Sequence, residues 1–287
     1  MHGASALKER FGLRVTVMND RRPARGQPPL SCWSGPVTPE PLKGGITNAN
    51  FVVSDRGRRH FVRIGDDILV HGILRFHELA ASRRGRRRWT LARCPSPRTR
   101  RRRVRVRRRQ DALQPAMSRQ PTNLRHILPL LQRCHREMPR HFRGPALIFW
   151  VFQIFRDYAQ TLADSGSRMV SELPRLLGVG ADLEAMVGPS MSSSATMICC
   201  PANFIDDGQR LWLIDWDYAG FNSPLFDLGN LCSNNEVAEA DEKDGCSKPI
   251  SKHADGRSVR AATQAMKCAS LLRETMWSMV SEHHSTL

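Results

Sequence analysis

Short apolar runs separated by polar turns predict two β-hairpins in this chain. Residues 51–53 and 60–64 flank the polar turn 54–58, and residues 203–205 and 211–214 flank the turn Asp206-Asp207-Gly208. Apolar, β-prone runs on both sides of a short polar turn are typical of antiparallel strands. We therefore expect one hairpin early in the chain and a second one late.

Helical spacing dominates much of the remaining chain. Apolar residues recur at three- and four-residue steps, which predicts helices over residues 73–81, 123–134, 146–162, 173–187 and 263–282. Residues 83–109 show no hydrophobic period, and the polar stretch 237–260 is expected to be a loop. Strands followed mostly by helices predict an α+β fold, with a small antiparallel sheet lobe before a larger helical lobe. We divide the chain into an atypical leader (1–28), a sheet lobe (29–120) and a helical lobe that contains the late hairpin (121–287).

The basic composition comes from one segment. The formal net charge is +17, and residues 83–109 contain 15 arginines but no Lys, Asp or Glu, so the charge without them would be +2. An arginine run can neutralise nucleic-acid phosphates. However, Trp89 is the one aromatic residue within it, and no RNA-binding motif surrounds it. Nucleic-acid binding is therefore a less favoured alternative, expected to be adventitious.

Cysteine spacing and hydropathy exclude several other classes of protein. The eight cysteines are scattered without a CxxC pair or a Cys/His ligand spacing, which argues against a structural zinc site and a disulfide framework. The sequence contains no run of about 18 apolar residues, so no membrane-spanning helix is expected. It has no apolar stretch near the N-terminus, so no secretory signal is expected. A cytoplasmic location is the simplest expectation. The oligomeric state is not readable from the sequence.

Oxygen-bearing side chains frame the late hairpin. Asn203 precedes its first strand, and Asp215 and Asp217 follow its second strand. Mg²⁺ prefers oxygen ligands such as an amide carbonyl and carboxylates. Kinase-like folds hold Mg²⁺ beside the nucleotide phosphates with an asparagine and an aspartate in this order. The alternative is a surface hairpin with ordinary acidic residues.

A further motif, Ser223-Pro224-Leu225-Phe226-Asp227-Leu228-Gly229-Asn230, follows at a short distance. The stretch 202–230 resembles the choline/ethanolamine kinase family of the aminoglycoside phosphotransferase and protein-kinase-like superfamily. In that family an HxDxxxxN loop precedes an IDxD strand end and an FDxGN motif. The resemblance implies a protein-kinase-like two-lobe fold, and ATP and Mg²⁺ as cofactors. It implies that Asn203 and Asp215 bind the metal, that Asp217 assists the metal and the substrate, and that Asp227 braces the loop.

The early hairpin carries matching signals. Residues 44–51 resemble the GGxTNxxF loop of choline kinases, and backbone amides of such loops cradle phosphates. This implies ATP contacts at Gly45, Thr47 and Asn48. Arg63 would replace the strand lysine that reaches the phosphates, and Glu78 would pair with it. Without the family, Arg63 is an exposed strand cation and Glu78 a charge on a helix face.

The last predicted helix carries a candidate substrate ligand. Met276-Trp277-Ser278 resembles the LWS element of choline kinases, a family in which tryptophans surround a quaternary ammonium group by cation–π attraction. Trp277 could equally be a core residue. Glu274 stands where the family has a second tryptophan, so choline specificity is in doubt although a carboxylate still attracts an amine. The resemblance implies transfer of the γ-phosphate of ATP to a small amino alcohol of the choline or ethanolamine type.

The catalytic loop departs from the family pattern. Counting back from Asn203, the histidine and aspartate of HxDxxxxN fall at Thr196 and Ile198. The aspartate accepts the proton of the attacking hydroxyl, and isoleucine cannot. The chain as written is therefore expected to be impaired as an enzyme, and a catalytically inactive pseudokinase is the alternative.

A shifted reading frame offers a second explanation for this departure. Residues 196–200 have codons that a one-base shift translates as His-Asn-Asp-Leu-Leu. Residues 88–92 have codons that the opposite shift translates as Ala-Gly-Leu-Ser-Pro, which resembles the family's segment after the first helix. We hypothesise that the catalytic loop and residues 83–120 are out of frame, which would make the arginine run and the +17 charge consequences of the shift. The sheet lobe of the chain as written is then expected to be incomplete.

Overall fold

The computed structural model describes residues 33, 35–42, 49–64, 67–74, 77–78, 101–105, 111–112, 121–141, 147–188, 194–196, 203–206, 211–213, 215–235, 237 and 256–284. The chain divides into two compact units. Unit 1 comprises residues 1–66, 91–108 and 285–287, and unit 2 comprises residues 67–90 and 109–284.

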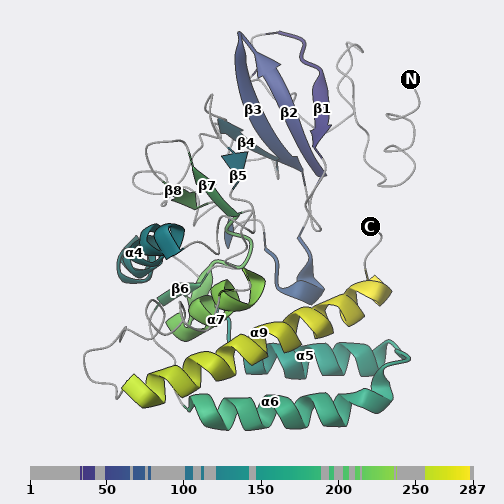
Figure 1. Ribbon diagram of the computed structural model, residues 1–287. Coiled ribbons are helices and arrows are strands. Elements are labelled where there is room, and N and C mark those ends of the chain that lie inside the picture. Colours follow the sequence, from purple (N-terminus) through teal and green to yellow (C-terminus); the bar gives the residue numbers. More distant parts are fainter. Residues whose placement is uncertain are drawn as a thin grey trace. The chain divides into compact units, whose positions relative to one another are not determined.

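Unit 1 contains a four-stranded antiparallel sheet with the strand order β1-β2-β3-β4 (Figure 1). Its strands are β1 (Pro39–Leu42), β2 (Ala49–Asp55), β3 (Arg58–Ile64) and β4 (Arg101–Arg105). The predicted early hairpin is confirmed, because β2 pairs with β3 through a turn in which Arg56 and Gly57 have φ values of 49° and 68°. Two left-handed residues make the hairpin turn whose twist matches that of the strands. Phe51 and Val53 are buried and pack with Trp33 and Val37.

Strand β4 lies where the sequence pattern predicted no regular element. It pairs with β3 from His60↔Arg105 to Ile64↔Arg101. A strand ladder is formed by backbone groups, and charged strands are common at sheet edges because they discourage further pairing. The missing hydrophobic period therefore did not exclude an edge strand.

Unit 2 is mainly helical. Its helices are α4 (Pro121–Glu137), α5 (Val151–Asp164), α6 (Leu173–Val187), α7 (Pro224–Asn234) and α9 (Gly256–His284). Short 3₁₀ turns are η1 (Leu69–His71), η2 (Met138–His141) and η3 (Val170–Glu172). Helix α9 packs along α5, α6 and α7 (Figure 1). No helix in the described ranges is long and apolar enough to cross a membrane.

The helices predicted over residues 123–134, 146–162, 173–187 and 263–282 are confirmed as α4, α5, α6 and α9, with different bounds for all but α6. Helix α6 has the predicted bounds, whereas α9 begins at Gly256, so residues 256–260 are helical and not loop. Helix α5 begins at Val151 because the preceding residues pair with a strand: Phe149 N donates to Phe221 O (2.8 Å) and Phe221 N to Leu147 O (2.7 Å). In the predicted helix 73–81, Ile73 instead forms a β-bridge with Ile68, and His77 and Glu78 are helical.

Two small sheets complete unit 2. The predicted late hairpin is confirmed as β7 (Phe204–Asp206) and β8 (Leu211–Leu213), with β5 (Asp111–Ala112) on the other side of β7. Strand β6 (Ser194–Thr196) pairs antiparallel with β9 (Gly220–Asn222).

Two hydrophobic clusters hold these elements. One joins the buried face of α4 to Phe204, Leu213, Trp216 and α7. The other joins α5, α6 and α9, with Phe226 of α7 packed among them. The hairpin β7–β8 and the turn after it are therefore anchored to the helical core, which fixes the position of the polar residues at the end of β8.

Candidate metal and substrate site

Three carboxylates from separate parts of unit 2 lie together and form what we call the acidic cluster: Glu78, Asp215 and Asp217. One carboxylate oxygen of each lies within 4.8 Å of those of the other two. Glu78 and Asp217 are buried, at 1% and 5% exposure, and Asp215 is half-buried. Like charges this close repel each other unless cations or hydrogen-bond donors compensate them. The arrangement is thus suited to a cation.

The backbone after β8 directs these aspartates. Asp215 has a φ of 65°, in the left-handed region that few non-glycine residues adopt and that aspartate tolerates better than most. The adjacent Trp216 is 1% exposed and anchors the turn in the core, and Ala219 N donates to Trp216 O at 3.1 Å. A sparsely populated backbone conformation next to a fixed core residue is found where function requires a particular geometry.

The potential metal ligands at the end of the β7–β8 hairpin are the hard oxygen atoms of amide and carboxylate groups. In the antiparallel pair β7–β8, Phe204 faces Leu213, so Asn203 and Asp215 lie at the same end of the hairpin. Carboxylate and amide oxygens are the ligands that Mg²⁺ takes in phosphoryl-transfer enzymes. The residue types and their spacing therefore fit Mg²⁺.

The structure tells less about the other residues that were predicted to form the site. Gly45, Thr47, Asn48 and Ile198 lie outside the described residues, and Thr196 pairs with Gly220 in the β6–β9 ladder. Arg63 lies in β3 opposite Asn50. Its pairing with Glu78 stays a prediction, whereas the acidic cluster is a second environment for Glu78 that sequence reasoning did not foresee.

Asp227 is bound to a residue that sequence reasoning missed. Its Oδ2 lies 2.7 Å from Nε2 of His135 on α4, and both side chains are buried. Since an ionised carboxylate only accepts hydrogen bonds, Nε2–H of His135 is the donor. A polar residue within the apolar face of α4, next to Cys134, is the signal that could have indicated it.

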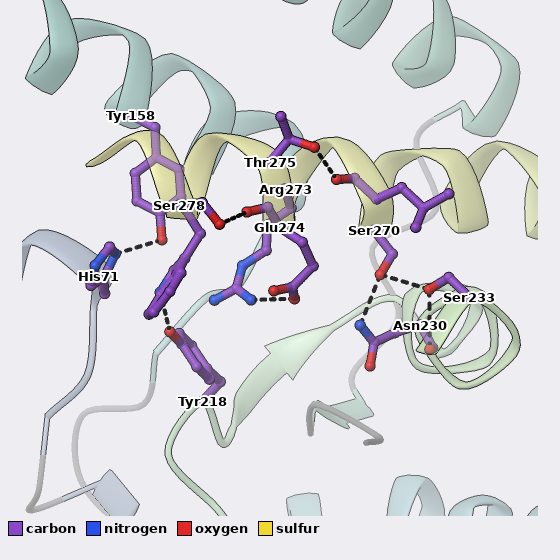
Figure 2. Close-up of polar contacts among 12 residues, drawn as sticks. His71, Tyr158, Tyr218, Asn230, Ser233, Ser270, Arg273, Glu274, Thr275 and Ser278 are labelled. Carbon is purple, nitrogen blue, oxygen red and sulfur yellow. Dashed lines mark hydrogen bonds and ion pairs between the residues drawn. The ribbon is translucent and has the colours of Figure 1, made fainter. Parts of the chain in front are cut away.

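The end of the FDLGN motif ties α7 to α9. Asn230 Nδ2 donates to Ser270 Oγ at 2.8 Å, and Ser233 Oγ donates to the same oxygen at 3.1 Å (Figure 2). A Cβ on Gly229 would lie 2.6 Å from Met266 C and from Lys267 N, so only glycine permits this helix–helix approach. The motif thus has a packing role between α7 and α9.

Trp277 belongs to an aromatic cluster formed by His71, Tyr158, Tyr218 and Trp277. Trp277 Nε1 donates to Tyr218 Oη at 3.2 Å, and its ring stacks on His71 with centroids 4.7 Å apart and an interplanar angle of 24°. His71 hydrogen-bonds to Tyr158 Oη through Nδ1 and to Ser281 Oγ through Nε2, both at 3.0 Å. Figure 2 shows the contact between His71 and Tyr158 beside α9, with Tyr218 below the helix. Tyr218 directly follows Asp217, which makes this cluster a neighbour of the acidic cluster.

Burial shifts the ionisation of the aromatic cluster. It lowers the pKa of His71 to about 4, aided by the charges of Arg273 and His284. Burial also raises the pKa of both tyrosines, although Arg273 opposes this rise. At neutral pH the cluster therefore holds a neutral imidazole and two neutral phenols.

Comparison with solved structures identifies the fold as that of the choline/ethanolamine kinases and related antibiotic phosphotransferases. The chain is similar to choline kinase LicA from Streptococcus pneumoniae, with a TM-score of 0.69 and 18% identity, over 86% of this chain and 87% of that one. It is similar to a choline/ethanolamine kinase family protein from Mesorhizobium loti, with a TM-score of 0.66 and 20% identity, over 88% and 81% of the two chains. A macrolide 2′-phosphotransferase from Brachybacterium faecium matches with a TM-score of 0.55 and 14% identity, over 87% and 89%.

The α+β kinase-like fold predicted from the sequence is confirmed by these structures, and so is the resemblance to this family. Sequence comparison agrees over a shorter range. Protein LicA from Haemophilus influenzae is 29% identical over 86 residues, which are 29% of this chain and 32% of the relative. No family model matches the sequence.

Proposed function

We propose that the chain is a Mg²⁺- and ATP-dependent phosphotransferase that acts on the hydroxyl of a small amino alcohol of the choline or ethanolamine type. The observation that carries this proposal is the acidic cluster, placed at the end of the β7–β8 hairpin in a choline-kinase-like fold. The neighbours with this fold are named as a choline kinase, an ethanolamine kinase and a macrolide 2′-phosphotransferase.

In this proposal Asn203 and Asp215 hold Mg²⁺, and Asp217 serves the metal and the acceptor alcohol. Glu78 adds a third carboxylate at the same place. Bound Mg²⁺ would neutralise charge on the ATP phosphates, which is the main demand of phosphoryl transfer. Asp227, held by His135, braces the elements that carry these residues.

The nucleotide is proposed from the resemblance. A solved structure of LicA contains AMP and matches this chain with a TM-score of 0.67. Gly45, Thr47, Asn48 and Arg63 are the proposed contacts of this chain to ATP. We place the reaction in the cytoplasm, where ATP and amino alcohols are available.

A pseudokinase is the second candidate, favoured by one observation. The positions that hold histidine and aspartate in the family's catalytic loop are Thr196 and Ile198. An isoleucine cannot accept the proton of the attacking hydroxyl. Nucleotide and metal binding by Asn203, Asp215 and Asp217 could persist without turnover.

The first test is to resequence the coding DNA over codons 80–122 and 186–203. If one-base insertions or deletions are found, the corrected chain should phosphorylate choline or ethanolamine with Mg·ATP. If the frame stands, turnover should be absent while Mg·ATP still raises the melting temperature, and the pseudokinase is supported. If neither chain binds Mg·ATP, the proposal is wrong.

A further inference from the structure

Helix α6 exposes a stripe of small and apolar residues. Its largest exposed side chains are Val179 and Met186, at 42% and 58% exposure. Residues three, four and seven positions apart share one face of a helix. By this spacing, the exposed positions that form what we call the outer face of α6 are Arg175, Gly178, Val179, Asp182, Ala185 and Met186.

The neighbouring helix α5 presents a different kind of surface. Its exposed residues are polar and bind each other: Gln153 Nε2 donates to Asp157 Oδ1 at 2.9 Å, and Gln160 Nε2 donates to Asp164 Oδ1 at 2.7 Å. Helix α6 packs its buried face against α5 and α9, which lie on one side of it in Figure 1. Contiguous exposed apolar residues, in contrast to single ones, mark interaction surfaces.

The two charges of the outer face are placed symmetrically on it. Arg175 and Asp182 are two helical turns apart, and their midpoint lies between Gly178 and Val179. A two-fold axis through this midpoint, perpendicular to the helix, sets Arg175 of one copy opposite Asp182 of the other, and does so twice. The same axis sets Gly178 opposite Val179. The outer face of α6 is therefore complementary to itself in an antiparallel pair.

The local contacts of Arg175 and Gly178 suit such a pair. Arg175 Nε donates to Oε2 of Glu172 at 3.0 Å, and the side chain of Arg175 is 68% exposed. A guanidinium carries five N–H donors, so Arg175 can bind a second carboxylate while it keeps Glu172. A Cβ added to Gly178 would meet no heavy atom within 4 Å, so the space above this part of the helix is open. A glycine there lets the backbone of a second helix approach closely.

We propose that the outer face of α6 is a docking surface for a second copy of this chain, which packs on it as an antiparallel helix pair about a two-fold axis. Two helices of this length bury less than about 1,200 Å² in total, so the dimer should be weak, with a Kd on the order of 10–100 µM. The proposal does not depend on the phosphotransferase function, because no residue of α6 belongs to the acidic cluster.

Analytical ultracentrifugation of the full chain from about 1 to 300 µM tests the proposal, since this range brackets the expected Kd. A salt concentration of about 0.15 M screens the long-range repulsion from the net charge of +17. The parent chain should change from monomer to dimer over this range. Asp182→Arg sets arginine opposite arginine, and Arg175→Asp sets aspartate opposite aspartate, so each variant alone should dimerise at least about tenfold more weakly.

An equimolar mixture of these two variants is the decisive sample. It sets arginine opposite aspartate at both positions again, so the mixture should associate about as strongly as the parent does. Asp164→Arg makes the same charge change on α5 and should leave association unchanged, and circular dichroism establishes that each variant is folded. The inference is overturned if the parent stays monomeric at about 300 µM, if the single variants associate as the parent does, or if the mixture associates no more than each variant alone.

Discussion

Nε2 of His135 lies 2.7 Å from Oδ2 of Asp227, and this contact joins α4 to α7 across 92 positions of sequence. Both groups are buried, so neither is easily solvated if the other is removed. His135→Leu should lower the free energy of unfolding by about 1–3 kcal/mol, because it deletes a donor to a buried carboxylate. Urea denaturation of the parent and the variant measures this difference. His135→Gln, which keeps an N–H donor, should cost less; equal stability of parent and His135→Leu would refute the bracing role.

Gly229 and Gly178 should respond in opposite ways to the same substitution. Gly229→Ala places a Cβ 2.6 Å from backbone atoms of α9 and should destabilise the protein by about 1–3 kcal/mol, since α7 and α9 must separate. Gly178 lies within α6, and a Cβ added there would meet no heavy atom within 4 Å, so Gly178→Ala should stabilise by about 0.5–1 kcal/mol. Denaturant midpoints of the two variants test the contrast. A stabilised Gly229→Ala protein would contradict the close helix approach.

A substitution at Asp215 should abolish metal binding and still allow the protein to fold. Asp215→Asn keeps a residue that tolerates φ of 65° and removes one carboxylate. It should fold, with a melting temperature equal to or above that of the parent in EDTA, because a repulsive charge is lost from the acidic cluster. The rise in melting temperature on adding Mg²⁺ should disappear.

A matched variant controls for the backbone at this position. Asp215→Leu should lose the Mg²⁺ effect as well, and should cost roughly 1–2 kcal/mol of stability, since a leucine is strained in the left-handed region. Differential scanning fluorimetry with and without Mg²⁺ measures both effects. Retention of the Mg²⁺ effect in Asp215→Asn would show that the ion binds elsewhere.

Acidification should destabilise unit 2 through His71. Its pKa falls from 6.5 to about 4 in the folded protein, so the unfolded chain binds a proton more readily. The stabilisation from the neutral buried ring is therefore complete above about pH 6.5 and is lost as the pH falls toward 4. Between about pH 7 and pH 5 the loss should be about 1–2 kcal/mol. The comparison of urea unfolding of the parent with His71→Gln isolates this contribution, and identical pH slopes would exclude it.

The sequence predicted those elements whose hydrophobic spacing or turn residues lie within a single segment. Helix α6 and both hairpins follow from spacing and turn chemistry that lie within one segment. The start of α5 was missed because Leu147 and Phe149 exchange hydrogen bonds with Phe221, a partner far away along the chain. Strand β4 was missed for a similar reason, since its pairing with β3 depends on backbone groups and not on apolar side chains.

The candidate site was predictable in part. Asp215 and Asp217 were indicated by their place after a hairpin, but nothing near Glu78 in the sequence shows that the chain returns it to them. Arg273 was missed although it sits on the buried stripe of α9 with Ala269, Met276 and Val280. A charged residue at an apolar position of a helix is a usable signal, because such burial requires compensating contacts.

The left-handed backbone at Asp215 also constrains how this position can change over generations. Glycine and asparagine are the other residues that accept such a φ readily. Every aspartate codon becomes an asparagine or a glycine codon by a single base change. Mutation can therefore remove the carboxylate in one step with the chain still folding, so descendants that keep the kinase-like shape but have lost the metal should arise easily, and selection for folding alone would not eliminate them.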